Sequence, residues 1–225
     1  MPKLATKRLH MVCSTNMVFC IDCSIPITKV IDYIKKNIID LLVFFESYDA
    51  DEEREASIKW QAKIMWYSKY HTDDDFLMYN NPFVSSIDEI KKQLEEIIKT
   101  YNNPKDEVIT SFKAIWLALN KAEWPDTNSK KLIFVFTDAQ SKQSGNTNQT
   151  GVIGIDNWDI IKCLAKDIDQ NGISLFFYGL ENDTNKIICQ IPRTTTYLFK
   201  DNIDFCVHTE IINNKDILNQ MIHHC

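Results

Sequence analysis

Two short runs of this chain are apolar at every position, and this feature constrains the fold most. They are MVFCI at residues 17–21 and LIFVF at residues 132–136, and ISLFFYGL at 173–180 follows the same pattern with one serine. A strand without a polar face has to be covered on both faces, as the inner strands of parallel sheets are. These runs are also too short to be typical helices. They therefore predict a sheet with helices on both sides.

Amphipathic segments alternate with these runs. A helix is expected after Pro26, where apolar residues recur at steps of three and four up to Phe45, and another is expected to begin at the capping box of Ser86 and Glu89. Two further helices are expected at 112–122 and 156–168, a strand at 63–70, a short strand at 197–199 or 205–207, and a last helix at 215–222. This alternation predicts an α/β fold with a doubly wound, mostly parallel central sheet flanked by helices on both faces.

Length and charge narrow the functional classes. The 225 residues, 44% of them hydrophobic, suit one domain over residues 1–225. The net charge of −6 comes from charges spread along the chain, so we expect no nucleic-acid partner, because phosphate binding needs clustered basic residues. No apolar stretch approaches the roughly twenty residues of a membrane helix. We read no signal peptide, and expect a cytoplasmic protein whose seven cysteines are reduced structural thiols.

Polar side chains stand directly after the two fully apolar runs. Asp22 follows the first run with Ser24 two positions on, and Asp138 closely follows the second. The carboxyl ends of parallel strands share one edge of a sheet, which is where ligands bind in such folds. Carboxylate and hydroxyl oxygens suit Mg²⁺ or Mn²⁺. The alternative is that each aspartate only caps the helix that follows its strand or orders a loop.

Three stretches together resemble the von Willebrand factor A superfamily, and in particular its bacterial tellurium-resistance-type members. They are VFCIDCSIPI, IMWYSKYHTDDDFLMYNNPFVSSIDEIKKQLEEI and ALNKAEWPDTNSKKLIFVFTDAQ, and the resemblance extends over about residues 9–222. It implies a metal-ion-dependent adhesion site built from D-x-S-x-S after the first strand, a Thr or Asp from a Gly-rich loop, and an Asp after the fourth strand. Asp22, Ser24 and Asp138 match this pattern.

The chain departs from that pattern at two places. Pro26 stands where the second serine is expected and has no hydroxyl group, and the loop at 102–111 contains no glycine. Thr110, Glu107 or Asp106 could supply the missing ligand, and Thr110 is the residue that we carry forward. Water can fill empty positions around Mg²⁺, but fewer protein ligands lower its affinity. The resemblance thus implies a degenerate site.

The resemblance implies an intracellular protein-interaction module or scaffold subunit. Its partner would bind the carboxyl edge of the sheet, with or without a divalent metal, and could offer an Asp or Glu to that metal. One alternative is a Mg²⁺-dependent phosphohydrolase with Asp22 as nucleophile, although Ser24 stands where such enzymes place a second Asp. Another is a structural subunit that assembles through an apolar face around Trp60, Trp66, Tyr67 and Tyr70.

Overall fold

The structure is a computed structural model that describes residues 11–22, 31–49, 56–69, 76–100, 111–125, 128–137, 157–181, 183–200 and 217. The strands are β1 (Met11–Asp22), β2 (Ala56–Lys69), β3 (Phe76–Asn80), β4 (Lys130–Thr137), β5 (Ile173–Leu180) and β6 (Thr194–Phe199). The helices are α1 (Ile31–Asp49), α2 (Ile87–Thr100), α3 (Ser111–Lys121), α4 (Asn157–Gln170) and α5 (Asp183–Ile188).

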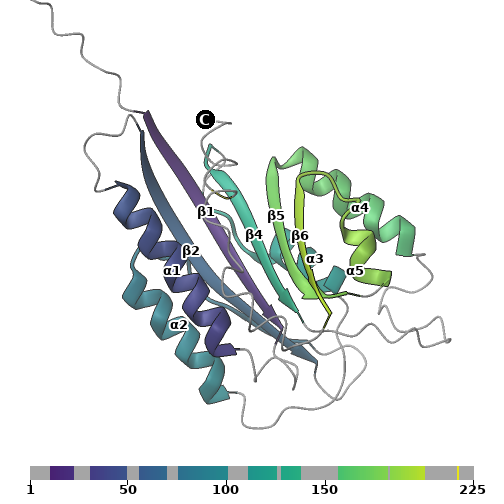
Figure 1. Cartoon of the computed structure of the whole chain (residues 1–225), viewed down its shortest axis with the longest axis horizontal. Coiled ribbons are helices and arrows are strands. Elements are labelled where there is room, and N and C mark those ends of the chain that lie inside the picture. The colour runs from purple at the N-terminus through teal and green to yellow at the C-terminus, as the bar shows by residue number, and fades with distance from the viewer. Residues whose placement is uncertain are drawn as a thin grey trace, which may run out of the picture.

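The strands form one sheet in the order β3-β2-β1-β4-β5-β6 (Figure 1). All neighbouring strands pair in parallel except β3, which pairs antiparallel with β2 at one edge. The chain builds outward from β1 to β3, then returns to the other side of β1 with β4 and continues to β6. The winding therefore reverses between β1 and β4. This arrangement confirms the predicted doubly wound, mostly parallel α/β fold.

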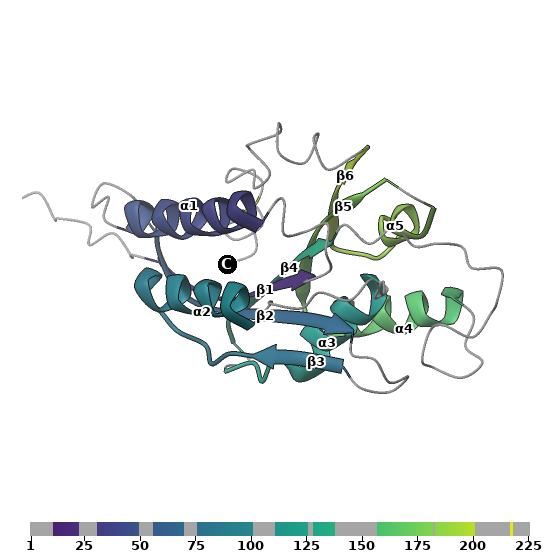
Figure 2. The same ribbon diagram turned by 90° about the horizontal axis from the view of Figure 1, so that it is seen from below.

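Alternate residues of β1 enter two separate cores. Met17, Phe19 and Ile21 pack in the cluster that includes the apolar faces of α1 and α2, whereas Val18 and Cys20 pack with α3 and α4. Figure 2 shows α1 and the pair α3 and α4 on opposite sides of the sheet. The continuously apolar runs are apolar because each of them serves both cores.

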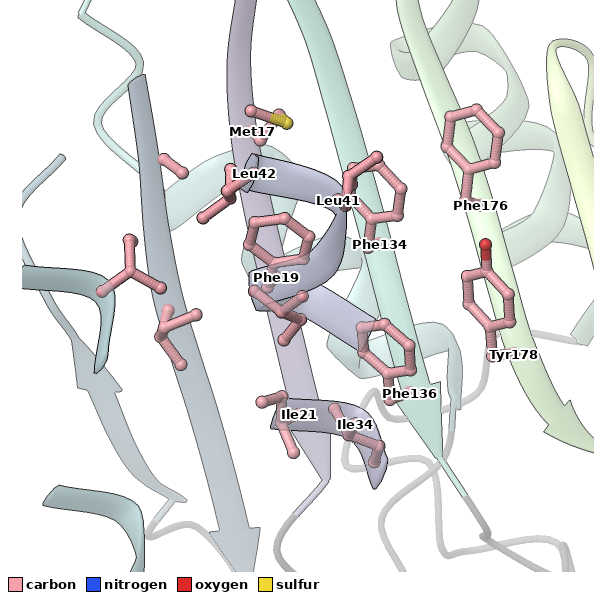
Figure 3. Packing of buried hydrophobic residues seen from close by; sticks show 14 of the residues in the cluster. Met17, Phe19, Ile21, Ile34, Leu41, Leu42, Phe134, Phe136, Phe176 and Tyr178 are labelled. Atoms are coloured by element: carbon pink, nitrogen blue, oxygen red, sulfur yellow. The ribbon is translucent and has the colours of Figure 1, made fainter. Parts of the chain in front are cut away.

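Aromatic rings form two rows across the strands on the face of the sheet that includes α1. Phe19, Phe134 and Phe176 stack with ring centroids 4.8 and 4.9 Å apart, and they are direct cross-strand partners in β1, β4 and β5 (Figure 3). A second row, nearer the carboxyl edge, joins Phe136 to Tyr178 at 5.0 Å and Tyr178 to Tyr197 at 4.7 Å. In-register pairing thus connects the four strands from β1 to β6 through side chains as well as through backbone hydrogen bonds.

Side chains from β2 and β3 hold the C-terminal end of α3. Lys63 is buried, and its Nζ donates a hydrogen bond of 2.7 Å to the carbonyl oxygen of Ala122, while Nζ lies 4.8 Å from the ring centroid of Phe83. Asn80 donates a hydrogen bond of 2.8 Å to the carbonyl of Lys121. The last carbonyl groups of a helix have no hydrogen-bond partner within the helix. A cation near them also interacts favourably with the negative end of the helix dipole. These contacts fix α3 against the β2–β3 pair.

Several details differ from the sequence-based expectations. Neither β3 nor α5 was expected, and β1 and β2 begin earlier than their apolar runs suggested. Trp116 lies in the helix expected at 112–122 and is apolar, but it is 43% exposed. The strand expected at 197–199 is confirmed as part of β6. The alternative strand at 205–207 lies outside the described residues, as does the expected last helix apart from Ile217, which is helical and buried.

The expectation of seven reduced cysteines is wrong for Cys13. Cys13 is buried near the start of β1 and is disulfide-bonded, whereas Cys20, Cys163 and Cys189 are free. The sequence does not reveal this disulfide bond, because the pairing of cysteines depends on distances between segments that are remote in sequence. As for the membrane, no helix in the described ranges is long and apolar enough to cross a bilayer.

Candidate functional site

Asp22 and Thr137 meet at the carboxyl ends of β1 and β4. The last paired residues are Ile21 and Phe136, so the next residue of each strand lies level with the other. The Oγ1 of Thr137 donates a hydrogen bond of 2.9 Å to Oδ2 of Asp22, and both side chains are buried. The contact lies where the winding of the sheet reverses, the usual ligand-binding place in doubly wound folds.

Helix α3 begins beside this pair. The Cys20 thiol lies 3.6 Å from the carbonyl oxygen of Ala114, in the first turn of α3, and can donate a hydrogen bond to it. At the other end of the helix, the carbonyl of Ala122 lies against Lys63, whose strand partner is Val18. Helix α3 therefore runs from the carboxyl edge back along the sheet. Its N-terminal end, where backbone N–H groups give a partial positive charge, faces the same edge as Asp22.

The neighbouring thiol is chemically quiet. Burial, and secondarily the negative charge of Asp22, raise the pKa of the Cys20 thiol far above its ordinary value. The thiolate is the nucleophilic and metal-binding form of cysteine, so Cys20 stays protonated at any physiological pH. Cys20 therefore acts as a small buried side chain, and the polar chemistry of this edge rests on oxygen atoms.

The burial of Asp22 corrects one sequence-based expectation. A residue directly after a strand is expected to lie outside the core, yet the Asp22 side chain is only 1% exposed. A buried carboxylate that loses its hydrogen-bond donors is costly. Thr137 was not singled out from the sequence. The signal was present, because parallel pairing of two strands that end on Asp22 and Thr137-Asp138 brings the threonine hydroxyl level with Asp22.

Most of the expected metal ligands cannot be placed. Ser24, Thr110 and Asp138 lie outside the described residues, as do Pro26, Glu107 and Asp106. Within the described part of the chain, no group of three or more His, Cys, Asp or Glu side chains could hold a metal ion. Of the expected ligands, the described residues therefore include only Asp22, and Thr137 is hydrogen-bonded to it.

The chemistry of these donors nevertheless fits a hard divalent cation. Asp22 contributes carboxylate oxygens at the point of reversal, Ser24 is two residues beyond it, and Asp138 directly follows Thr137 in the sequence. Thr110 immediately precedes Ser111, the first residue of α3. All four are oxygen ligands of the kind that Mg²⁺ and Mn²⁺ prefer.

Comparison with known proteins gives a family and a set of similar folds. The family model described as von Willebrand factor type A domain matches residues 16–207. No curated protein matches the chain. Proximal thread matrix protein 1 from the mussel byssus superimposes with a TM-score of 0.56 at 12% identity, covering 91% of this chain and 46% of that one. The human COPII-coat protein Sec24c gives 0.54 at 14% identity, covering 94% and 32%.

A second structure of the mussel protein has a zinc-occupied adhesion motif. It superimposes with a TM-score of 0.56 at 10% identity and covers 91% of this chain and 46% of the other. At such identities these likenesses show the fold alone. The present chain spans less than half the length of these structures.

Proposed function

Because the chain belongs to the von Willebrand factor type A family, we propose that it is a protein-interaction module that binds its partner at the carboxyl edge of β1 and β4. One observation carries this proposal: the hydrogen-bonded Asp22 and Thr137, both buried, at the point where the sheet reverses its winding. Since Asp22 is only 1% exposed, it would act on a partner through a bound metal ion or through the residues that it holds in place, and its hydrogen bond fixes its position before a partner arrives. Domains of this family commonly mediate contacts between proteins.

We further propose that this edge takes a divalent metal, Mg²⁺ or Mn²⁺, held by Asp22, Ser24, Asp138 and Thr110. The zinc-occupied motif of the mussel protein supports metal binding in a related fold, but it does not identify the metal here. When bound, the ion would supply a positive centre for an Asp or Glu of the partner. Pro26 provides no hydroxyl ligand, so the proposed site is degenerate and its metal affinity low.

A more specific proposal is that the chain is a scaffold subunit of the tellurium-resistance type. Two of the similar folds belong to a coat protein and to a matrix protein, and such names favour assembly over catalysis for this chain as well. The expected cytoplasmic location stays a prediction. Genes adjacent to this one would test the tellurium-resistance relationship, since those relatives are usually encoded beside stress-associated proteins.

The two alternative functions have less support. The phosphohydrolase stays a prediction, and it would require Asp22 to act as a nucleophile although this side chain is buried and accepts a hydrogen bond from Thr137. Assay of the protein with Mg²⁺ and a generic phosphate ester tests it. The structural-subunit alternative requires an exposed apolar face of aromatic residues near β2. Trp60, Trp66 and Tyr67 are buried and so do not form one, while Tyr70 lies outside the described residues.

Capture of partners from the native host tests the proposal. We would use tagged wild type and Asp22→Asn, each in Mg²⁺ and in EDTA, and identify the captured proteins by mass spectrometry. Asparagine preserves the size of the side chain and can still accept the hydrogen bond from Thr137, so folding is disturbed less than with alanine. Asp88→Asn is the matched control, because Asp88 is an exposed aspartate on α2, away from the edge.

Partners that are lost with Asp22→Asn but kept with Asp88→Asn would support recognition at the carboxyl edge. Loss of the same partners in EDTA would support the metal as well. Partners kept by both variants would contradict the proposed edge, and circular dichroism of each variant would exclude unfolding as the cause of a loss.

A further inference from the structure

Two basic side chains lie near each other at the edge of the sheet where the parallel strands begin, which we call the amino edge. Lys130 is the first residue of β4, and Arg193 directly precedes β6. Strand β5 lies between these two strands (Figure 1), and Gly172 directly precedes it. The starts of three neighbouring strands therefore hold Lys130, Gly172 and Arg193 at the edge opposite to Asp22.

The register of the sheet brings the two basic groups together over Gly172. In the pairing of β4 with β5, Lys131 is opposite Ile173, so Lys130 and Gly172, which precede them, lie level with each other. An ideal Cβ at Gly172 would lie 4.0 Å from Nη1 of Arg193. The guanidinium thus reaches back across the start of β5 toward the lysine, over a residue that has no side chain to separate them.

The backbone of Arg193 has a conformation that is costly for a residue with a Cβ atom. Its φ is 58°, in the left-handed region. The carbonyl oxygen of Arg193 accepts a hydrogen bond of 3.0 Å from the backbone N–H of Leu175, which holds this conformation against β5. Strained residues of this kind cluster at binding sites. The fold therefore keeps the guanidinium over Gly172 although the backbone is strained.

The two basic groups have like charges and no counterion in the described part of the chain. Burial, and secondarily the positive charge of Arg193, lower the pKa of the Lys130 amine, and no acidic side chain among the described residues opposes this shift. Neither residue belongs to an ion pair within those residues. Like charges at close range repel each other, and a bound anion between them removes that cost.

Hydroxyl groups lie beside the basic pair. Thr15 is the direct strand partner of Lys130 in β1, and its side chain is fully buried, but its Oγ1 has no hydrogen-bond partner among the described residues. Ser174 is half-buried and lies two residues after Gly172. Side chains alternate along a strand, so Thr15, Lys130 and Ser174 belong to the same face of the sheet. A buried hydroxyl group usually has a partner, so the unused one beside Lys130 points to a ligand.

We propose that Lys130 and Arg193 bind a phosphate group at the amino edge, with the hydroxyl groups of Ser174 and Thr15 bordering the site. A guanidinium offers a planar fork of donors to two phosphate oxygens, and an ammonium adds a compact charge. Two cations match the double negative charge of phosphate, whereas a carboxylate has one charge. The phosphate group can be free or part of a monoester, since both offer the same oxygens. The site is separate from the edge at which Asp22 lies.

Titration of the full chain with inorganic phosphate tests the proposal. Phosphate replaces chloride at constant ionic strength and about pH 7.5, where it carries close to two negative charges. NMR spectra of the backbone amides report where it binds. We expect saturable shifts of the Gly172 and Ser174 amides, and no shift of the amide of Asp22.

Variants with matched changes in charge locate the binding groups. Lys130→Gln and Arg193→Gln should each weaken phosphate binding about tenfold, because each removes one charged donor. Lys131→Gln is the control, since it changes the net charge equally. The Nζ of Lys131 lies 5.8 Å from the ring centroid of Trp124, which packs against the core on the other face of the sheet, so this variant should bind phosphate as the wild type does.

Three results would overturn the proposal. They are equal shifts with chloride, equal binding of acetate, and unchanged phosphate binding in both Lys130→Gln and Arg193→Gln, with circular dichroism confirming that each variant is folded. A parallel titration with the amide of N-acetyl-phosphoserine identifies the source of the phosphate. Tighter binding of the ester than of inorganic phosphate would support a monoester on a larger molecule, and binding of inorganic phosphate without the ester would support the free ion.

Discussion

At the scale of single residues, the hydrogen bond between Thr137 and Asp22 joins the two strands on which the proposed site depends. Asp22 is buried, so its carboxylate needs hydrogen-bond donors, and Thr137 supplies one of them from the neighbouring strand. The same bond sets the direction in which the carboxylate points. Stability and recognition should therefore change together when the hydroxyl is removed.

Thr137→Val tests this link. Valine has nearly the same shape but no hydroxyl, so we expect a loss of about 1–3 kcal/mol in the free energy of unfolding, measured by urea denaturation, together with weaker partner capture. Thr137→Ser keeps the hydroxyl and should retain most of both. If Thr137→Val captured partners as well as the wild type, the orientation of Asp22 would not matter for binding.

Lys63 predicts a characteristic pH dependence. Burial lowers the pKa of this amine from 10.5 to about 8, although the charge of Glu123 opposes the shift. Between pH 8 and 10.5 the unfolded chain therefore holds a proton that the folded chain has released, and this contribution makes the protein more stable as the pH rises. Below pH 8 the folded protein has to keep a charged amine buried, which costs stability.

Lys63→Met is the matched variant, because methionine is also unbranched but does not titrate. Urea denaturation of both proteins at several pH values between 7 and 10 should show the wild type gaining stability relative to the variant, by up to about 1.4 kcal/mol per pH unit. Parallel curves for the two proteins would contradict the lowered pKa.

The candidate site could be predicted from the sequence only in part. Asp22 at the end of an apolar run was identifiable because strand ends in a parallel sheet are recognisable from periodicity. Its burial and its bond to Thr137 were not, since both depend on the register between β1 and β4. The disulfide of Cys13 was missed for the same reason, because it requires contact between remote segments.

At the scale of elements, the rows of stacked rings connect strands that are distant in sequence. Phe134 lies between Phe19 and Phe176, and all three rings are fully buried on the face of the sheet that α1 helps to cover. Offset stacking adds to the gain from burying each ring. The central row should therefore contribute strongly to the stability of the sheet.

Phe134→Ala should lower the free energy of unfolding by about 3–5 kcal/mol, because it leaves a cavity between two rings. Phe134→Leu fills most of the space and should cost less. The control is Val43→Ala on the exposed face of α1, where a change within about 0.5 kcal/mol is expected. Urea denaturation measures all three. A loss below about 1 kcal/mol for Phe134→Ala would show that the row has little importance.

The helices and parallel strands were predictable because their apolar periodicity is strong. The expected helix start at Ser86 is confirmed, since α2 begins at Ile87. Strand β3 pairs only at an edge and α5 has only six residues, so neither leaves a clear periodic pattern. Hydrophobicity alone would put Trp116 on the core face of α3, yet neighbouring residues of the helix already fill that face.

At the scale of the whole molecule, the order of the strands explains where a partner would bind. The chain builds the sheet on both sides of β1, and the reversal brings the ends of β1 and β4 together at one edge. The N-terminal end of α3 faces this edge, and the buried carboxyl group of Asp22 lies near it. The fold thus places two hydrogen-bonded polar groups, Asp22 and Thr137, at the edge proposed for recognition.

Hydrogen–deuterium exchange of the protein with and without a captured partner tests recognition at the carboxyl edge most directly. The account predicts that binding slows exchange at the carboxyl ends of β1 and β4 and in the first turn of α3. Exchange in β3 and α2 should be unchanged. Protection confined to β3, α2 or the exposed face of α3 around Trp116 would contradict recognition at the carboxyl edge.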